Sequence, residues 1–465
     1  MKKWGAFVFY LMLTLLGKSQ GFLHISGKSI VDSTGHQVIL RGVNLGGWLV
    51  TEDWMCGITD TTDSGGRSAR KTLESIYPDS MVTRLFNTWE DNWITASDID
   101  TIKSLGFNFM RVPFEWRNLQ DQNQHWYLDT AGNIDLSRLD WIVSQAAQHH
   151  MYVLLDFHIW LDQDLAYNGI SGTDSVVRST CQIWRVVAEH FKDNPTIAGY
   201  DMLNEPTSSA GEYVKQMIYD TIRSVDPYHM ISIEWTAIDT SRWHNVLYQD
   251  HWYGLSASTL AGNEAIFDTT YIPILLSADS LGVPYYIGET QVADDSSYAW
   301  SLNEYCLYHT NWSPWTYKTI NEWGWGMISI YPNNVRVNLF TDPYDTILYR
   351  WSQVSNANNW YELQNVKTIW SNAARCGETT NGIERTADGG QVRLYPNPAS
   401  SAIQILCPSA YIGLHYNIVD LLGKSITNGE LTTENQVVEI GQLTEGIYFL
   451  KIDSSHLVCL KFIKE

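Results

Sequence analysis

Basic residues are scarce in this chain of 465 residues, which has 30 lysines and arginines against 51 aspartates and glutamates and a formal net charge of −21. Proteins that bind nucleic acid need a basic surface to neutralise phosphates, so this balance excludes nucleic acid as the expected partner. It also disfavours polyanionic ligands such as uronic acid polymers, because like charges repel. A neutral polymer would meet no such repulsion.

Long apolar runs are absent after the N-terminus. Met1-Lys2-Lys3 and the apolar stretch Ala6–Leu16, followed by small residues up to Gly21, are typical of a secretory signal peptide, which we predict at residues 1–21. That apolar stretch is too short to cross a membrane, and no later segment has about 18 consecutive apolar residues. We therefore expect no membrane span and a soluble, exported mature chain.

Metal-binding patterns are also missing. Neither a Cys-x-x-Cys nor a His-x-x-x-His spacing occurs, so a structural zinc site is not expected, and we predict no metal and no organic cofactor. Export permits disulfides, but the wide spacing of the six cysteines leaves their pairing open. They are Cys56, Cys181, Cys306, Cys376, Cys407 and Cys459.

Tryptophan is absent after Trp370, although 21 tryptophans precede that point or occupy it. The change coincides with a polar, glycine-rich stretch that has neither helical nor strand periodicity, which indicates a linker at residues 377–391. The chain is thus expected to hold a large domain at 22–376 and a smaller module at 392–465.

In the large domain, short apolar strand-like segments alternate with amphipathic helical ones, which is typical of a (β/α)8 barrel (TIM barrel). The expected helices are Met81–Leu105, Leu136–His150, Val176–Lys192, Gly211–Ser224 and Asn303–His309. The expected strands are Val38–Asn44, Phe107–Arg111, Tyr152–His158, Ile197–Asn204, Met230–Trp235, Val246–Trp252, Tyr285–Glu289 and Trp312–Thr316. A hairpin at Leu23–Gly35 precedes them and could cap the barrel floor.

Polar residues collect at the C-terminal ends of these strands, where barrel enzymes carry their active sites. Taken singly, each has an ordinary explanation: a salt-bridge partner, a core histidine, a packed tryptophan. Their joint placement at one rim favours a functional site. They are Glu52, Arg111, His158, Asn204, Glu205, His251, Tyr253, Glu289 and Trp315.

Two of these residues, Glu205 and Glu289, are carboxylates that close separate strands. Such a pair is what cleavage of a glycosidic bond needs, with one group as acid and the other as base or nucleophile. Asn204-Glu205-Pro206 alone would be weak evidence, because it also suits a turn. Glu234, at the end of another strand, is a rival nucleophile by position.

The rim segments resemble glycoside hydrolase family 5 (cellulase family A), and the first and last of them are most similar to its exo-β-1,3-glucanase branch. The resemblance covers Phe22–Ala374. The segments that carry it are Arg41–Val50, Met110–Pro113, Leu155–His158, Asn204–Pro206, His251–Tyr253, Ile287–Glu289 and Trp315–Lys318.

The resemblance implies a retaining mechanism. Glu205 matches the acid/base, which must be protonated to donate to the leaving oxygen. Glu289 matches the nucleophile, with Arg111 and the hydroxyl of Tyr253 suited to holding its charge. In retaining enzymes the two carboxyl groups lie about 5–5.5 Å apart, and we expect that separation here.

The same resemblance implies sugar-binding roles around the pair. Asn204 would hydrogen-bond the sugar 2-hydroxyl, and His158 and His251 match binding and network positions. Trp315 would offer a flat apolar face to the pyranose ring, and Glu52 would accept hydroxyl hydrogen bonds. The segments that follow His158 and Glu289, and the stretch 321–345, depart from the branch pattern, which leaves linkage and exo action open.

The last module consists of short alternating strands broken by Gly, Asn and Pro, which indicates a β-sandwich. Its segments are similar, from end to end, to the type A sorting domain of the type IX secretion system (Por). The resemblance implies the secretion machinery as a partner, passage across the outer membrane, and a secreted or cell-surface protein. A small carbohydrate-binding sandwich is the competing interpretation, and the lack of tryptophan argues against it.

The sequence therefore predicts a secreted retaining β-glycoside hydrolase that acts on a neutral β-glucan, with glucan β-1,3-glucosidase-like action. An endo-β-1,4-glucanase (cellulase) or β-mannanase of the same family is the alternative within enzymes. The alternative from another class is a non-catalytic surface glycan-binding protein, against which the presence of both Glu205 and Glu289 argues.

Overall fold

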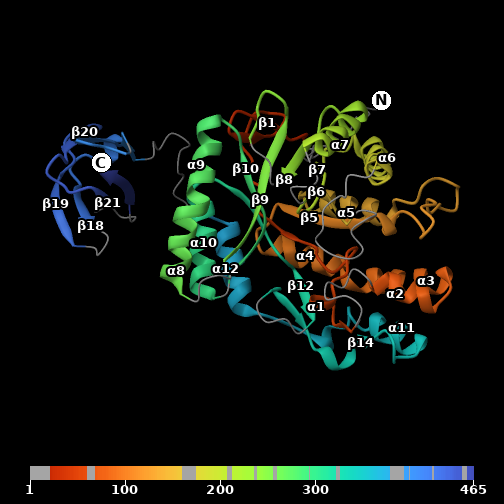
Figure 1. Cartoon of the computed structure of the whole chain (residues 1–465). Helices are drawn as coiled ribbons and strands as arrows, with labels where there is room; N and C mark the ends of the chain where they lie inside the picture. The colour runs from red at the N-terminus through yellow and green to blue at the C-terminus, as the bar shows by residue number, and fades with distance from the viewer. Residues whose placement is uncertain are drawn as a thin grey trace, which may run out of the picture. The chain divides into compact units, whose positions relative to one another are not determined.

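A computed structural model describes most of the chain and divides it into two compact units, Met1–Gly377 and Glu378–Glu465 (Figure 1). The division falls inside the predicted linker, residues 377–391, which lies outside the described residues, as do residues 1–20 of the predicted signal peptide. The described ranges are 21–59, 69–159, 174–206, 212–234, 238–254, 259–292, 294–320, 325–376, 392–396, 398–420, 424–452 and 458–464.

Eight parallel strands form the core of the first unit, which confirms the predicted barrel. Nearly every strand residue is buried, as expected for a parallel sheet covered by helices, and this explains why each strand was visible as an apolar run. Trp312 donates its N–H to the carbonyl of Leu40 (3.0 Å) and thereby closes the sheet. In sheet order the strands are β3 (Gly42–Asn44), β5 (Phe109–Glu115), β6 (Tyr152–Ile159), β7 (Ile197–Asp201), β8 (Met230–Glu234), β9 (Val246–Gly254), β10 (Tyr285–Val292) and β11 (Asn311–Pro314).

Helices surround the strands, and one predicted helix, Met81–Leu105, is wrong as a single element. It is two helices, because the chain is extended at Ile94 and restarts with Asp98 accepting the N–H of Thr95 (2.8 Å). The described helices are α1 (Asp53–Cys56), α2 (Ala69–Ile76), α3 (Asp79–Trp93), α4 (Ala96–Ser104), α5 (Ser137–Gln148), α6 (Asp174–Phe191), α7 (Glu212–Val225), α8 (Leu260–Ile266), α9 (Ile272–Leu281), α10 (Asp295–Leu307), α11 (Tyr344–Ser352) and α12 (Gln364–Ala374).

The predicted hairpin is present as β1 (His24–Ser26) paired with β2 (Ser29–Val31). Leu23 and Ile30 pack in one buried cluster with residues from the N-terminal ends of the barrel strands. The hairpin therefore covers the barrel floor, as predicted, and leaves the opposite end for the site. The strand residues of this cluster are Phe109, Leu154, Ala198, Met230, Leu247 and Tyr286.

After β11 the chain leaves the barrel to form a small sheet of β12 (Lys318–Ile320), β13 (Ile328–Ile330) and β15 (Trp360–Glu362). A two-residue pairing joins β4 (Ile58–Thr59) to β14 (Val337–Asn338). A disulfide between Cys306 and Cys376, whose pairing the sequence left open, ties the end of the first unit to α10.

The second unit has two antiparallel sheets around its own apolar core, which confirms the all-β module. One sheet has the order β16 (Arg393–Tyr395), β17 (Ala402–Leu406), β20 (Asn435–Glu439). The other has the order β19 (Ser425–Glu430), β18 (His415–Asp420), β21 (Gly446–Ile452), β22 (Val458–Lys464). Among the described residues of the whole chain, no helix combines the length and apolarity that crossing a membrane requires.

Candidate active site

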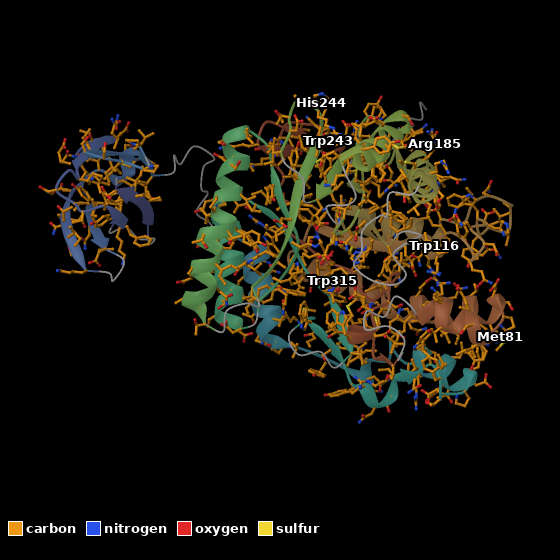
Figure 2. All side chains as sticks on the ribbon, viewed as in Figure 1. Met81, Trp116, Arg185, Trp243, His244 and Trp315 are labelled. Carbon is orange, nitrogen blue, oxygen red and sulfur yellow. A yellow bond between two sulfur atoms is a disulfide. The ribbon has the colours of Figure 1, made fainter. Side chains whose placement is uncertain are left out.

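A cavity of about 350 Å³ opens at the C-terminal ends of the barrel strands. Seven of the nine residues predicted from the sequence line it, and Figure 2 shows Trp315 beside the start of the small sheet. Arg111 and His251 lie behind this lining and contact it, so the structure brings all nine together. The lining residues are Glu52, Trp54, His158, Asn204, Glu205, Tyr253, Glu289, Trp315 and Trp325.

Arg111 is the buried centre of the site, with no exposed surface. The predicted strand end at Arg111 is wrong, because β5 continues to Glu115 and places Arg111 deep in the barrel. Three carboxylates and two side-chain amides surround the guanidinium, which satisfies its donors in a setting where an unpaired charge would be costly. They are Asp201 (2.9 Å), Glu289 (2.7 Å), Asp156 (3.1 Å), Asn204 (2.8 Å) and Asn44 (3.0 Å).

Glu289, within β10, receives one donor on each carboxyl oxygen. Arg111 Nη1 donates to Oε1 (2.7 Å), and the hydroxyl of Tyr253 donates to Oε2. Burial, together with the charges of Glu289 and Glu205, raises the pKa of Tyr253 well above its ordinary value, so Tyr253 keeps the proton that it donates. Both contacts stabilise a negatively charged Glu289.

Glu205 lies in the loop after β7, which ends at Asp201 and not at Asn204 as predicted. Its φ of 43° is a left-handed conformation that costs energy for a residue with a side chain. Its backbone N–H donates to Glu234 Oε2 (2.6 Å), and its Oε1 lies 2.9 Å from His251 Nδ1. The side chain of Glu205 is 18% exposed, so the carboxyl group reaches the cavity from a partly desolvated position.

His251, on β9, is surrounded by carboxyl groups and is nevertheless neutral. Its Nδ1 lies 3.3 Å from Glu234 Oε1 and 3.4 Å from Glu289 Oε2. Burial lowers the pKa of His251 to about 3, which outweighs the opposing effect of Glu289. An uncharged imidazole contacts both proposed catalytic carboxyl groups without neutralising either.

His158 is the charged histidine of the site. Its Nδ1 lies 2.7 Å from Asp156 Oδ2, and its ring stacks on Trp315 with centroids 5.2 Å apart. Burial alone would lower the pKa of His158, but the charge and hydrogen bond of Asp156 raise it to about 9. Trp315 thus has one face covered by a cation and lines the cavity.

This pKa predicts a pH-dependent stability. The folded state holds the His158 proton more tightly than the unfolded chain, whose histidine has a pKa of 6.5, so the stabilisation is complete below pH 6.5 and is lost as pH rises through about 9. The stabilisation lost over this pH range is about 3 kcal/mol. We expect the free energy of unfolding, measured in urea, to fall over this range in the wild type and to fall much less in His158→Asn.

His36→Asn is the matched control for that measurement, since the side chain of His36 is 80% exposed. This variant should reproduce the wild-type curve. Parallel curves for the wild type and His158→Asn between pH 6.5 and pH 9 would contradict a raised pKa for His158.

An aromatic wall beside Glu52 was missed from the sequence. Trp54 donates its indole N–H to Glu52 Oε2, and its ring meets Trp325 edge-on at 5.0 Å. Trp325 in turn lies 5.7 Å from the ring of Tyr253. The signal for Trp54 was its position two residues after Glu52, whereas Trp325 lies in the stretch that departs from the branch pattern.

Asp201 was also missed, although it holds Arg111 Nε from β7. Its other oxygen accepts from Gln249 Nε2. A carboxylate closing the apolar run Ile197–Asp201 was the available signal, because such a group is buried only when it is paired.

Glu205, His251 and Glu289 are the group of described residues that could hold a cation. One ligand atom from each lies within 4.8 Å of the others. The same distance brings a carboxyl oxygen of Glu205 near one of Glu289, which allows one sugar carbon and its leaving oxygen to contact both.

Comparison with known proteins gives two family matches. Residues 75–326 match the family model described as Cellulase (glycosyl hydrolase family 5). Residues 393–465 match the secretion system C-terminal sorting domain.

Among curated proteins, the chain is 30% identical to a β-xylosidase of Phanerodontia chrysosporium over 262 residues, which is 50% of this chain and 52% of that protein. It is 28% identical to a probable glucan 1,3-β-glucosidase A of Aspergillus niger, over 37% of this chain and 42% of that protein. The chain thus spans about half the length of the curated relatives that it matches. A solved β-glucanase from Saccharophagus degradans is similar over 72% of this chain and 93% of its own, at 20% identity and a TM-score of 0.45.

Proposed function

The chain belongs to glycosyl hydrolase family 5, and on this premise we propose that it is a secreted retaining β-glycoside hydrolase that cleaves a neutral β-glucan. The observation that carries the proposal is the pairing of Glu205 with Glu289 across one cavity, with carboxyl oxygens within 4.8 Å of each other. This approach suits the separation of about 5–5.5 Å in retaining enzymes better than the 6.5–9.5 Å that leaves room for a water in inverting ones.

In the first step, Glu289 Oε attacks the anomeric carbon while the bond to the leaving oxygen breaks. Glu205 gives its proton to that oxygen, so the leaving sugar departs as an alcohol and Glu289 becomes a glycosyl ester. Arg111 and Tyr253 hold the attacking carboxylate in place through their hydrogen bonds.

In the second step, Glu205 is a carboxylate and takes a proton from water. The resulting hydroxide equivalent attacks the same carbon, breaks the ester to Glu289 and restores both groups, with net retention at the anomeric centre. Asn204, whose Oδ1 accepts a hydrogen bond from Arg111, lines the cavity, and we assign its amide to the sugar 2-hydroxyl. That contact would strengthen as positive charge develops on the ring.

Glu234 is a poorer nucleophile than Glu289. Burial and the nearby charges of Glu205 and Asp201 raise the pKa of Glu234 well above its ordinary value, which favours a neutral group. Its Oε2 is engaged by the backbone of Glu205 and does not line the cavity.

A neutral glucan suits the composition of the cavity. Trp54, Trp315 and Trp325 offer apolar ring surface, and Glu52 offers an acceptor for hydroxyl groups. The printed activities of the curated relatives, β-xylosidase, glucan 1,3-β-glucosidase and endoglucanase, are all cleavages of neutral β-linked glycans. We propose glucan β-1,3-glucosidase-like action.

Export is proposed from the other end of the chain. The match at residues 393–465 supports delivery by the type IX secretion system to the cell surface or the extracellular space. The apolar N-terminal stretch, as a signal peptide, would supply the first export step.

A panel of laminarin, mixed-linkage glucan, carboxymethylcellulose, mannan and xylan tests the proposal, with product lengths followed over time. We expect fastest release from laminarin, glucose as the first product, and the β-anomer first in the proton NMR spectrum. A ladder of oligosaccharides would show endo action instead of exo action. Release of the α-anomer first would refute retention. No hydrolysis of any member would favour a glycan-binding protein.

A further inference from the structure

Glu234 is a buried carboxyl group in contact with Glu205 to which the proposed mechanism gives no role. It ends β8, is 1% exposed, and faces groups from four neighbouring elements. Those titratable or charged groups are Glu205 after β7, Asp201 on β7, His251 on β9, Arg111 on β5 and Lys215 on α7.

The first contact of Glu234 is with the backbone of Glu205. Strands β7 and β8 stay in register up to Asp201 and Ser232, and the last backbone bond between them joins Met202 to Ser232 (3.4 Å). Beyond that point the chain turns away, and the N–H of Glu205 finds the Glu234 carboxyl at 2.6 Å. The Glu234 side chain thus accepts the backbone N–H of Glu205 in place of a carbonyl from the neighbouring strand, at the residue whose backbone is left-handed.

Glu234 itself is held firmly. The ammonium of Lys215 donates to the backbone carbonyl of Glu234 (3.1 Å), and β9 pairs alongside with Gln249 opposite Glu234. An acceptor whose own backbone is fixed can stabilise a strained neighbour, because the strain persists only where the surroundings enforce it.

The second contact of Glu234 is with the histidine that the acid/base also contacts. Glu234 Oε1 lies 3.3 Å from His251 Nδ1, and Glu205 Oε1 lies 2.9 Å from the same atom. Arg111 is already shared by Asp156, Asp201 and Glu289. A further buried anion at Glu234 would therefore be poorly compensated, so the neutral form is favoured.

We propose that Glu234 is a positioning residue whose carboxyl group holds the backbone of Glu205 in its left-handed conformation and so aims the acid/base at the leaving oxygen. The inference rests on the proposed function, because it assigns to Glu234 a role that acts through Glu205. In the first step, which kcat/KM reports, a role through Glu205 matters only when the leaving group needs its proton.

Substrates with different leaving groups distinguish this role from a nonspecific perturbation of the active site. In an unactivated oligosaccharide, the leaving sugar departs as an alcohol only with a proton from Glu205. In a 2,4-dinitrophenyl glycoside, dinitrophenolate departs as an anion and needs no proton. In Glu234→Ala we expect kcat/KM on the oligosaccharide to fall by about 100-fold, a typical share of general acid catalysis. On the dinitrophenyl glycoside, kcat/KM should fall by less than about threefold, because that bond breaks without an acid.

Glu234→Gln keeps an acceptor oxygen for the N–H of Glu205 and cannot carry charge. We expect it to retain oligosaccharide kcat/KM within about threefold, with an unchanged alkaline limb of the pH profile, because burial and the nearby charges of Glu205 and Asp201 raise the pKa of Glu234 and favour its neutral form. Glu189→Gln, on the surface of α6 with a side chain 54% exposed, controls for loss of a carboxylate. Circular dichroism and thermal unfolding establish that each variant is folded.

Three results would overturn the inference. Equal losses of Glu234→Ala on both substrates would show damage that does not act through Glu205. A Glu234→Gln variant as impaired as Glu234→Ala, or with a displaced alkaline limb, would show that the native carboxylate charge is needed. No difference between Glu234→Ala and Glu189→Gln would show that the contact is dispensable. A wild type that hydrolyses neither substrate would instead contradict the proposed function on which this inference rests.

Discussion

Glu289→Ala should lose at least about 10⁴-fold in kcat on the best substrate of the glycan panel, because the covalent route has no attacking atom. Arg111 would keep its place, since its remaining partners Asp201 and Asn204 still bind it. The loss should therefore appear without unfolding, as judged by an unchanged far-ultraviolet spectrum and release of reducing sugar measured in parallel.

Chemical rescue sharpens this expectation. Azide fits the space that the Glu289 side chain vacates and can attack the anomeric carbon in its stead, which gives an α-glycosyl azide from a β-linked substrate. Glu205→Ala, with azide on the opposite face, should give the β-glycosyl azide. Activity of Glu289→Ala within about tenfold of the wild type would remove Glu289 from the mechanism.

Arg111→Met should destabilise the fold by about 3–5 kcal/mol, because it removes the cation from a buried ion cluster and leaves its carboxylates uncompensated. The guanidinium has no exposed surface and contacts Asp156, Asp201 and Glu289 within 3.1 Å. The urea midpoint should fall accordingly, and activity should fall as well, since Glu289 loses a donor.

Lys28→Met is the matched control, since it breaks the ion pair with Asp279, whose partners are 62% and 58% exposed. Exposed pairs contribute about 0–1 kcal/mol, so this variant should unfold close to the wild type. If Arg111→Met were as stable as Lys28→Met, the ion cluster would not hold the barrel interior together.

The barrel was predictable because each of its strands is buried on both faces and therefore appears as a continuous apolar run. The error at β5 has a physical reason. Pro113 follows Arg111 closely and lacks a backbone N–H, a feature that normally argues against a central strand and that the continuous apolar pattern does not reveal as tolerated. In the structure Pro113 pairs in register with Asp156, and the strand continues to Glu115.

Single residues at the rim were predictable where they lie within a barrel strand, as Glu289 and His251 do. The remaining features depend on contacts between distant segments, which local periodicity does not carry. The N–H of Glu205 meets Glu234 only because β7 and β8 diverge, and Trp54 meets Trp325 across some 270 residues of chain. The break at Ile94 depended on a two-residue cap that the long amphipathic pattern concealed.

Trapping of the covalent intermediate tests the central claim most directly. A 2,4-dinitrophenyl 2-deoxy-2-fluoro-β-glucoside should lose dinitrophenolate once and leave a fluorosugar ester on the enzyme. The fluorine slows both steps, and the dinitrophenolate leaving group speeds only the first, so the ester accumulates. Peptide mass spectrometry should place that ester on Glu289, in the segment Tyr285–Val292. A label on Glu234, or turnover with no labelled peptide, would contradict the account.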